Sequence, residues 1–408
     1  MKKYFILKGV EGNLLKYTVA LVTHKRLFVA ILGAYYLTIP DVTPWWVGTI
    51  LFASTLSGFL FEIPSGYIAD KIGHKKALVV SSVSLVLSTS FFLLAESIPF
   101  LFLGGILLSI GFAFISGTGT AFVHETLRAL GRESEFREIM GKMKSIGFAI
   151  PIILTTLIPF LVSISWHLPF AIALVSDLMG LIAVCSLVTP PVPQEHIDEI
   201  RLSNFKQVMH EAYKINFFRY AIFSGILAGI LFGVGGFRAV YQSTLGIPVV
   251  WFGVLFGIGR GIASLLLWHS GRIQRLFKTP TQIYTVKLVV FTFLIIVLGL
   301  TQNVWGIAVI FIFINAFEWG SSNIGYSVEA TGKSKFKATL LSVKSQIQML
   351  VGGGSAFLLG YLIEIIGYQK SFLVLALILV CLLTPLLYMI AKDKKRIGVG
   401  GEDSGSGE

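Results

Sequence analysis

Charged residues and cysteines are both scarce in this chain. Only 13% of its 408 residues are charged, and its two cysteines are Cys185 and Cys381. Both lie within apolar runs and outside any Cys-x-x-Cys pair or metal-ligand spacing, so we interpret them as packing residues. The sequence also lacks His-Glu-x-x-His and Gly-x-Ser-x-Gly motifs, an Asp-rich metal set and a nucleotide-binding loop. These absences argue against an enzyme and an ATP-driven pump, and we expect no cofactor and no metal site.

Apolar residues dominate the composition instead. They make up 55% of the chain, and the mean hydropathy is +0.81. A helix that crosses a membrane needs roughly 20 mainly apolar residues. About twelve such runs can be placed, near residues 14–38, 45–69, 76–96, 99–124, 138–162, 168–189, 217–243, 249–269, 281–301, 304–328, 338–365 and 370–391. The sequence therefore predicts an all-α integral membrane protein, whose first run begins too deep in the chain for a cleaved signal peptide.

The formal net charge of +12 is concentrated in alternate loops. The basic loops contain Lys71, His74, Lys75 and Lys76; Arg128, Arg132 and Arg137; Arg272, Arg275 and Lys278; and Lys333, Lys335 and Lys337. The loops between them, near residues 40–44, 96–99, 163–167, 244–249 and 301–303, contain no Lys or Arg. By the positive-inside rule, we expect both termini in the cytoplasm. Because no polar domain is present to hold a nucleic-acid surface, the charge indicates membrane orientation and not nucleic-acid binding.

A faint repeat divides the chain into two parts. Trp46–Gly48 and Ser65–Gly66 have the same separation as Trp251–Gly253 and Ser270–Gly271. A second match aligns Phe136, Lys144 and Ser145 with Phe336, Lys344 and Ser345. We therefore predict two pseudo-symmetric six-helix halves, residues 1–190 and 217–391. They are joined by a cytoplasmic linker with an amphipathic helix, residues 191–216, and followed by a disordered tail, residues 392–408.

The turn between the second and third runs has a distinctive spacing. It reads Gly66-Tyr67-Ile68-Ala69-Asp70-Lys71-Ile72-Gly73-His74-Lys75-Lys76. This spacing resembles the signature loop of the major facilitator superfamily, Gly-x-x-x-Asp-Arg/Lys-x-Gly-Arg-Arg/Lys. The preceding Glu62–Gly66 resembles the Glu-x-Pro-Ser/Thr-Gly of bacterial and archaeal members labelled as transporters or drug exporters. The resemblance implies the superfamily fold, a monomer and transport of a small molecule.

The resemblance also implies a cytoplasmic latch between the two halves. Its residues would be Gly66, Asp70, Lys71, Gly73, His74, Lys75 and Lys76. Arg128 or Lys142 are candidate partners, and Gly66 would allow close approach of a neighbouring helix. The alternative is an ordinary basic loop whose charge reflects topology alone.

Three consecutive basic residues lie within the first apolar run. A helix beginning at Leu27 would be too short to span the bilayer, so we expect it to reach back towards Leu14 and bury His24-Lys25-Arg26 near its middle. We favour Arg26, on one face with Thr23, as the residue that lines a substrate pathway. The alternative is a kinked or partly re-entrant helix whose basic side chains extend to the cytoplasmic surface.

Further charged residues lie at membrane depth, where they are costly and rarely without a role. The candidates for the substrate pathway are Lys25, Arg26, Lys144, Arg238, Arg260 and Lys344, and those for proton coupling are Glu62, Asp177 and Glu318. Burial favours the protonated form of a carboxyl group, as a proton-coupled carrier requires. Structural salt bridges between helices are the alternative explanation for any one of these residues.

These observations favour a secondary active transporter in the cytoplasmic membrane. The excess of basic groups indicates an anionic or zwitterionic amphipathic substrate. The two-half arrangement favours alternating access, the resemblance implies efflux, and the carboxyl groups at membrane depth indicate coupling to protons or another ion. The alternatives are a lipid or lysolipid flippase on the same fold, or an uptake facilitator for an organic anion.

Overall fold

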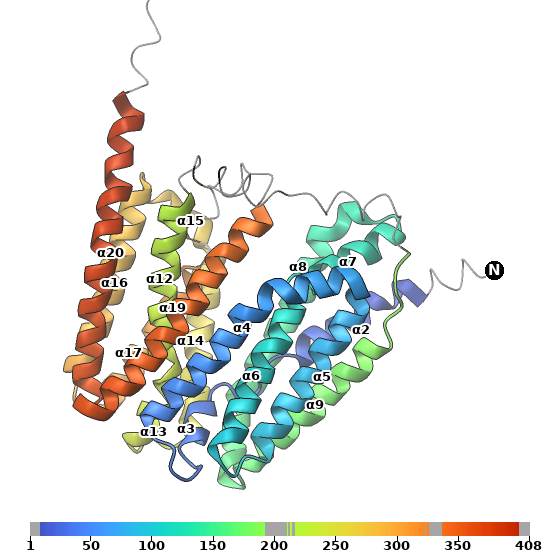
Figure 1. Ribbon diagram of the computed structural model, residues 1–408, viewed down its shortest axis with the longest axis horizontal. Helices are drawn as coiled ribbons and strands as arrows, with labels where there is room; N and C mark the ends of the chain where they lie inside the picture. The colour runs from blue at the N-terminus through green and yellow to red at the C-terminus, as the bar shows by residue number, and fades with distance from the viewer. Residues whose placement is uncertain are drawn as a thin grey trace, which may run out of the picture. The chain divides into compact units, whose positions relative to one another are not determined.

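The computed structural model of the protein, drawn in Figure 1, describes residues 9–191, 210, 213, 217–322, 324–325 and 337–399. The regular secondary structure of these residues is helical throughout. Within the described part of the chain, ten helical segments are long and apolar enough to cross a membrane, and Val304–Gly320 is a shorter apolar helix. The predicted all-α membrane fold is thereby confirmed. Glu329 and the basic loop at residues 333–335 lie outside the described residues. So does the predicted linker, apart from residues 191, 210 and 213.

Contacts divide the chain into two compact units. Unit 1 contains Met1–Leu202 and Phe237–Gly257, and unit 2 contains Ser203–Gly236 and Ile258–Glu408. The division does not follow a single cut in the sequence, because a short segment after residue 236 packs with the N-terminal residues. The predicted boundaries at residues 190 and 217 stay a prediction.

Unit 1 is a bundle of helices, most of which come from the first half of the sequence. Its elements are α2 (Asn13–Thr23), α3 (Leu32–Tyr36), α4 (Pro44–Ile72), α5 (His74–Leu93), α6 (Ile98–Ile115), α7 (Thr118–Ala129), the 3-10 helix η1 (Glu133–Glu135), α8 (Phe136–Leu157), the 3-10 helix η2 (Ile158–Ser163), α9 (His167–Cys185), α13 (Arg238–Thr244) and the start of α14 (Val250–Trp268). Helices α5 and α6 pack closely because Ser81 and Ser88 each donate a 2.7 Å hydrogen bond to the carbonyl of a glycine, Gly111 and Gly104. Small residues at such interfaces let helix backbones approach in a membrane.

The first predicted run is not one continuous helix. Helix α2 ends at Thr23 and α3 begins at Leu32, and the residues between them form turns. On a continuous helix, His24 and Arg26 would point about 200° apart. The break removes that restriction, and both side chains are buried, His24 at 3% and Arg26 at 9% exposure. The prediction of one continuous helix over this run is therefore wrong. At the break, hydrogen bonds to side chains on neighbouring helices stabilise His24 and Arg26.

Unit 2 contains the remaining described helices. They are α12 (Phe217–Gly236), the rest of α14, α15 (Ser270–Arg275), α16 (Pro280–Leu300), α17 (Val304–Gly320), α19 (Lys337–Ile366) and α20 (Tyr368–Val399). Helix α20 continues past Ala391, so the first eight residues of the predicted disordered tail are helical. Lys and Arg, frequent in this stretch, are good helix formers and extend the helix beyond its apolar part. Cys185 on α9 and Cys381 on α20 are free and exposed. Their interpretation as packing residues is therefore wrong.

A glycine stripe on α12 sets its packing against α19. Gly225, Gly229 and Gly233 recur every four residues, so they share one face of the helix. A Cβ atom on Gly225 would lie 2.6 Å from Ile347 Cγ2, and one on Gly229 would lie 2.9 Å from the backbone nitrogen of Gly352. The two helices therefore touch through backbone at this face.

We expect Gly229→Val to lower the free energy of unfolding by about 1–3 kcal/mol, because the added side chain has no space against α19. The matched control is Gly354→Val on α19, where a Cβ atom would meet nothing within 4 Å. Thermal unfolding of both variants in one detergent measures the difference. Equal unfolding temperatures for the two variants would contradict the close contact.

Candidate functional site

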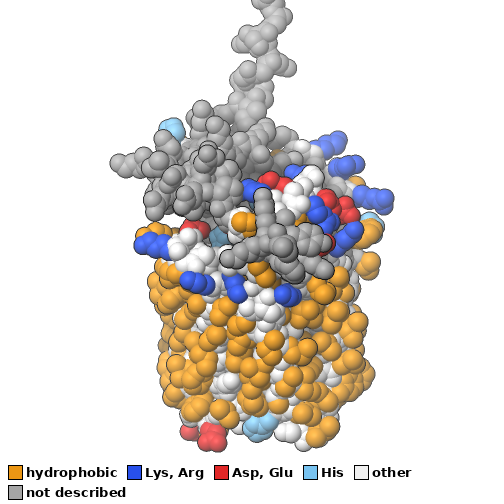
Figure 2. Space-filling view, turned by 90° about the vertical axis from the view of Figure 1, so that its right-hand side faces the viewer, with side chains coloured by type: hydrophobic (Ala, Val, Ile, Leu, Met, Phe, Trp, Pro, Cys, Tyr) orange, Lys and Arg blue, Asp and Glu red, His pale blue; other side chains and the backbone are white. Residues whose placement is uncertain are grey.

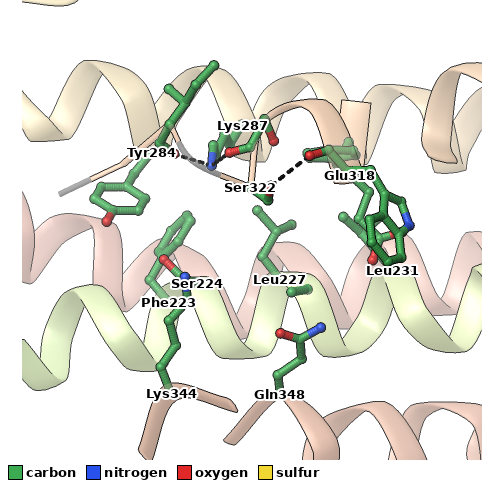
Figure 3. Close-up of a pocket in the computed structure, with 15 residues that line it drawn as sticks. Phe223, Ser224, Leu227, Leu231, Tyr284, Lys287, Glu318, Ser322, Lys344 and Gln348 are labelled. Atoms are coloured by element: carbon green, nitrogen blue, oxygen red, sulfur yellow. Dashed lines mark hydrogen bonds between the residues drawn. The ribbon is translucent and has the colours of Figure 1, made fainter. Parts of the chain in front are cut away.

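Unit 2 contains a cavity of about 180 Å³ between α12, α16, α17 and α19, which we call the charged cavity. Figure 3 shows it with Lys287 on one side and Lys344 and Gln348 on the other. Its polar and charged lining residues are Ser224, Lys287, Glu318, Ser321, Ser322, Lys344 and Gln348, and its aromatic ones are Phe223, Tyr284, Phe291 and Trp319. The lining thus combines two lysines and one glutamate with aromatic and aliphatic side chains. This combination suits a ligand with an apolar body and an anionic group.

Lys287 is held at the C-terminal end of α17. Its Nζ donates hydrogen bonds of 2.9 Å to the Ser321 carbonyl and 2.5 Å to the Ile324 carbonyl. An ammonium group at this end of a helix compensates the partial negative charge of the terminal carbonyls. The sequence analysis missed this residue. The signal was present, because Lys287 is the single charged residue in the run 281–301.

Glu318 and Arg260 form a second charged group beside the same cavity. Glu318 lines the cavity, and Arg260 contacts another lining residue, with its Cζ 3.7 Å from the centroid of the Trp319 ring. Arg260 also interacts electrostatically with Glu318. A guanidinium over an indole face is a favourable cation–π contact, and it fixes the Trp319 ring. Of the residues predicted for the pathway or for coupling, Lys344 and Glu318 therefore line this cavity directly.

A buried polar network in unit 1 joins three helical segments. Arg26 donates to Asp177 through both terminal nitrogens, at 2.6 and 3.0 Å, and Thr89 donates to the same carboxylate at 2.6 Å. Arg26 also donates to Thr89 at 2.9 Å, which closes the triangle. His24 Nε2 lies 3.0 Å from Ser82 Oγ, so His24 and Arg26, both in the break of the first run, each contact a side chain on α5. The structure thus pairs a predicted pathway residue with a predicted coupling residue.

Arg238 lies at the start of α13, directly after α12 ends. It is 6% exposed, donates at 3.3 Å to the Ala30 carbonyl in the break between α2 and α3, and lies over the Phe256 ring. Helices α13 and α3 are in contact, and a Cβ atom on Gly33 would lie 2.9 Å from Val240 Cγ2. Arg238 therefore satisfies a carbonyl that helical geometry leaves open.

The remaining predicted candidates make other contacts. Lys25 Nζ is 4.3 Å from the centroid of the Phe148 ring, and Lys144 is exposed on α8. Glu62 accepts a 3.0 Å hydrogen bond from Ser116, and Ser65 donates at 2.9 Å to the Ala113 carbonyl. The Glu62–Gly66 motif thus anchors α4 to the end of α6.

The turn between α4 and α5 differs from its predicted contacts. His74 Nε2 lies 3.1 Å from Glu125, whereas Arg128 pairs with Glu133 and Lys142 with Glu138. Both predicted latch partners are therefore engaged on their own segments, because an acidic residue close in sequence is available to each. Figure 2 shows Lys and Arg gathered at one end of a face that is otherwise mainly hydrophobic. The role of this turn as a latch stays a prediction.

Gly73 and Gly66 differ in how strictly their positions in the turn require glycine. Gly73 has φ +89°, a region that favours glycine, whereas a Cβ atom on Gly66 would meet nothing within 4 Å. Among the described residues nothing approaches Gly66 closely, and the predicted close helix approach at this glycine stays a prediction.

We expect Gly66→Ala to raise the free energy of unfolding by about 0.5–1 kcal/mol, since alanine is the better residue inside a helix. Gly73→Ala is expected to lower it by about 1–2 kcal/mol, since alanine is strained at positive φ. Unfolding temperatures of the two purified variants check the pair. A loss of stability in Gly66→Ala as large as that in Gly73→Ala would refute this prediction.

Comparison with known proteins gives a consistent result. A family model described as Major Facilitator Superfamily matches residues 26–343. The chain is 24% identical over 376 residues to the Bacillus subtilis (strain 168) protein named "Uncharacterized MFS-type transporter YxaM", covering 88% of this chain and 90% of that one. A mutant of the nucleoside transporter NupG aligns with a TM-score of 0.73 at 13% identity, over 93% of this chain and 99% of its own. A bacterial homologue of the human lysosomal transporter Spinster, inward-facing and unoccupied, aligns with a TM-score of 0.69 at 15% identity, over 96% and 97%. At such identities the two structures show the fold alone.

Proposed function

Because the chain belongs to the major facilitator superfamily, we propose that it is a secondary active transporter for a small amphipathic anion or zwitterion. It is a multi-pass membrane protein, and the proposed location is the cytoplasmic membrane. The proposed mechanism is alternating access between the two sides of the bilayer. The substrate carries a carboxylate or phosphate group on an apolar body.

The charged cavity is the observation that carries this proposal. Lys287 and Lys344 line it together with one carboxylate, that of Glu318. Ammonium groups bind carboxylate and phosphate oxygens through charge-assisted hydrogen bonds. The aromatic residues around them supply the apolar contact that a small-molecule site needs. In the proposed site, the carboxylate of Glu318 binds the amino group of a zwitterion.

Proton coupling and export are further parts of the proposal. Glu318 lies in the cavity beside the proposed substrate position, so its protonation would alter the charge that the substrate meets. Export is supported by the resemblance of Glu62–Gly66 to the motif of drug-exporter-like members. Lys25, Lys144, Arg238 and Arg260 stay proposals as pathway residues, with Arg260 acting through Trp319.

Uptake of labelled compounds into proteoliposomes tests the proposal. Three compounds share one aromatic body and differ in bearing a carboxylate, an amino acid group or a trimethylammonium group. We expect transport of the first two, and a loss of about ten- to a hundredfold in Lys344→Gln, equal to one charged hydrogen bond. Lys278→Gln, an exposed site outside the cavity, is the control. Transport of the cation alone, or equal rates in both variants, would refute the proposal.

A further inference from the structure

A second cavity adjoins the charged cavity in unit 2. It has a volume of about 250 Å³, and we call it the apolar groove. Its walls include Leu266 on α14, Ile273 on α15, Val286 and Val290 on α16, and Phe317 on α17. No polar atom is exposed on its lining. Such a surface fits hydrocarbon and offers nothing to a polar ligand.

Lys287 forms the division between the two cavities. Together with Phe291, Ser321 and Ile324, it lines both of them. Because the groove exposes no polar atom, only the methylene carbons of Lys287 face it. The ammonium group binds the Ser321 and Ile324 carbonyls, which uses two of its three N–H donors. The side chain is thus apolar towards the groove and charged at its tip.

The surroundings of the groove place it against the bilayer. Val286 on α16 is 43% exposed, and Leu265 and Leu276, which directly precede the groove residues Leu266 and Phe277, are 65% and 78% exposed. Exposed apolar side chains on a membrane-spanning protein meet lipid hydrocarbon. Helix α15 carries Arg272 and Arg275, which belong to a basic and hence cytoplasmic loop. The groove therefore faces the cytoplasmic leaflet.

We propose that the charged cavity and the apolar groove form one site for a single-chain anionic amphiphile taken laterally from the cytoplasmic leaflet. The anionic head group binds Lys287 and Lys344, and the hydrocarbon chain fills the groove between α14, α15, α16 and α17. Charge complementarity selects the head group, and the Lys287 side chain, which lines both cavities and is apolar towards the groove and charged at its tip, puts a site for one hydrocarbon chain next to the site for the head group. The inference rests on the proposed transport of an amphipathic anion and names its chemical class and route.

The test is photolabelling of the full-length protein in nanodiscs by dodecyl phosphate with a diazirine at the chain end, followed by peptide mapping. We expect labelling of residues that line the groove, with competition by unlabelled dodecyl phosphate but not by dodecanol or inorganic phosphate. Val286→Trp fills the groove and is expected to reduce competable labelling about tenfold, as loss of burial of two methylenes predicts. Val289→Trp is the matched control, since Val289 is 61% exposed on the same helix outside the groove.

The head-group contact is tested separately by Lys344→Met, with an expected loss of about ten- to a hundredfold in competable labelling. This variant leaves the carbonyl contacts of Lys287 in place, so it does not depend on the folding of a Lys287 variant. Uniform labelling of the lipid-facing surface without competition would mean annular lipid only and would overturn the inference. Equal labelling of Val286→Trp and Val289→Trp would also overturn it. Transport of short-chain anions that needs Lys344 but not an open groove would reject the inference while leaving the proposed function intact.

Discussion

Replacing Asp177 with leucine is expected to lower the free energy of unfolding by about 3–5 kcal/mol, the usual cost of removing one partner of a buried ion pair. Asp177 is 2% exposed and accepts two hydrogen bonds from Arg26 and one from Thr89. In the variant, the Arg26 guanidinium keeps its charge in a nearly dry environment without its carboxylate. Thermal and denaturant unfolding of the purified protein measures the loss.

The double variant Arg26→Met with Asp177→Leu tests whether the unpaired buried charge of Arg26 causes this loss of stability. We expect it to regain most of the lost stability, because neither side chain then brings a charge into the interior. Glu138→Gln is the surface control, since its ion pair with Lys142 is exposed and contributes little. A double variant no more stable than Asp177→Leu alone would show that the buried charge is not the cause.

Glu318→Gln is expected to abolish substrate-driven proton movement while substrate binding persists. Among the described residues that line the charged cavity, Glu318 has the one carboxyl group, and glutamine keeps its shape but cannot release a proton. A pH dye trapped in proteoliposomes reports the proton movement when the carboxylate compound of the transport panel is added.

Glu62→Gln is the matched variant, because Glu62 was also predicted for coupling but lies in unit 1 and binds Ser116. We expect it to retain the pH signal. A signal that survives in Glu318→Gln and disappears in Glu62→Gln would transfer the coupling role to α4. Substrate uptake without a pH change in the native protein would point instead to another coupling ion.

Hydropathy and charge were sufficient to predict most of the spans, because each depends on nearby residues. The break between Thr23 and Leu32 was not predictable in this way, since both sides of it are apolar and the stabilising partners lie elsewhere. Asp177 is 151 residues from Arg26 in the sequence, so no local pattern could pair them. Each was identified only as an unexplained charge at membrane depth.

The candidate site shows the same division between local and distant information. Lys344 and Glu318 were recognised as charges in apolar runs. The same criterion, applied to the run 281–301, would also have identified Lys287. The enclosure that brings them together depends on the contact of α12 with α19 through Gly225 and Gly229. The sequence alone could not identify which face of α12 would meet α19.

Cysteine protection in the charged cavity tests the central claim most directly. In a variant with Cys185 and Cys381 replaced by serine, Ser322→Cys places a thiol in the cavity and Ser264→Cys places one on α14 outside it. We predict that the carboxylate compound slows alkylation at position 322 and leaves position 264 unchanged, whereas the trimethylammonium compound protects neither. Unchanged alkylation at position 322 with a compound that the protein transports would contradict a substrate site in this cavity.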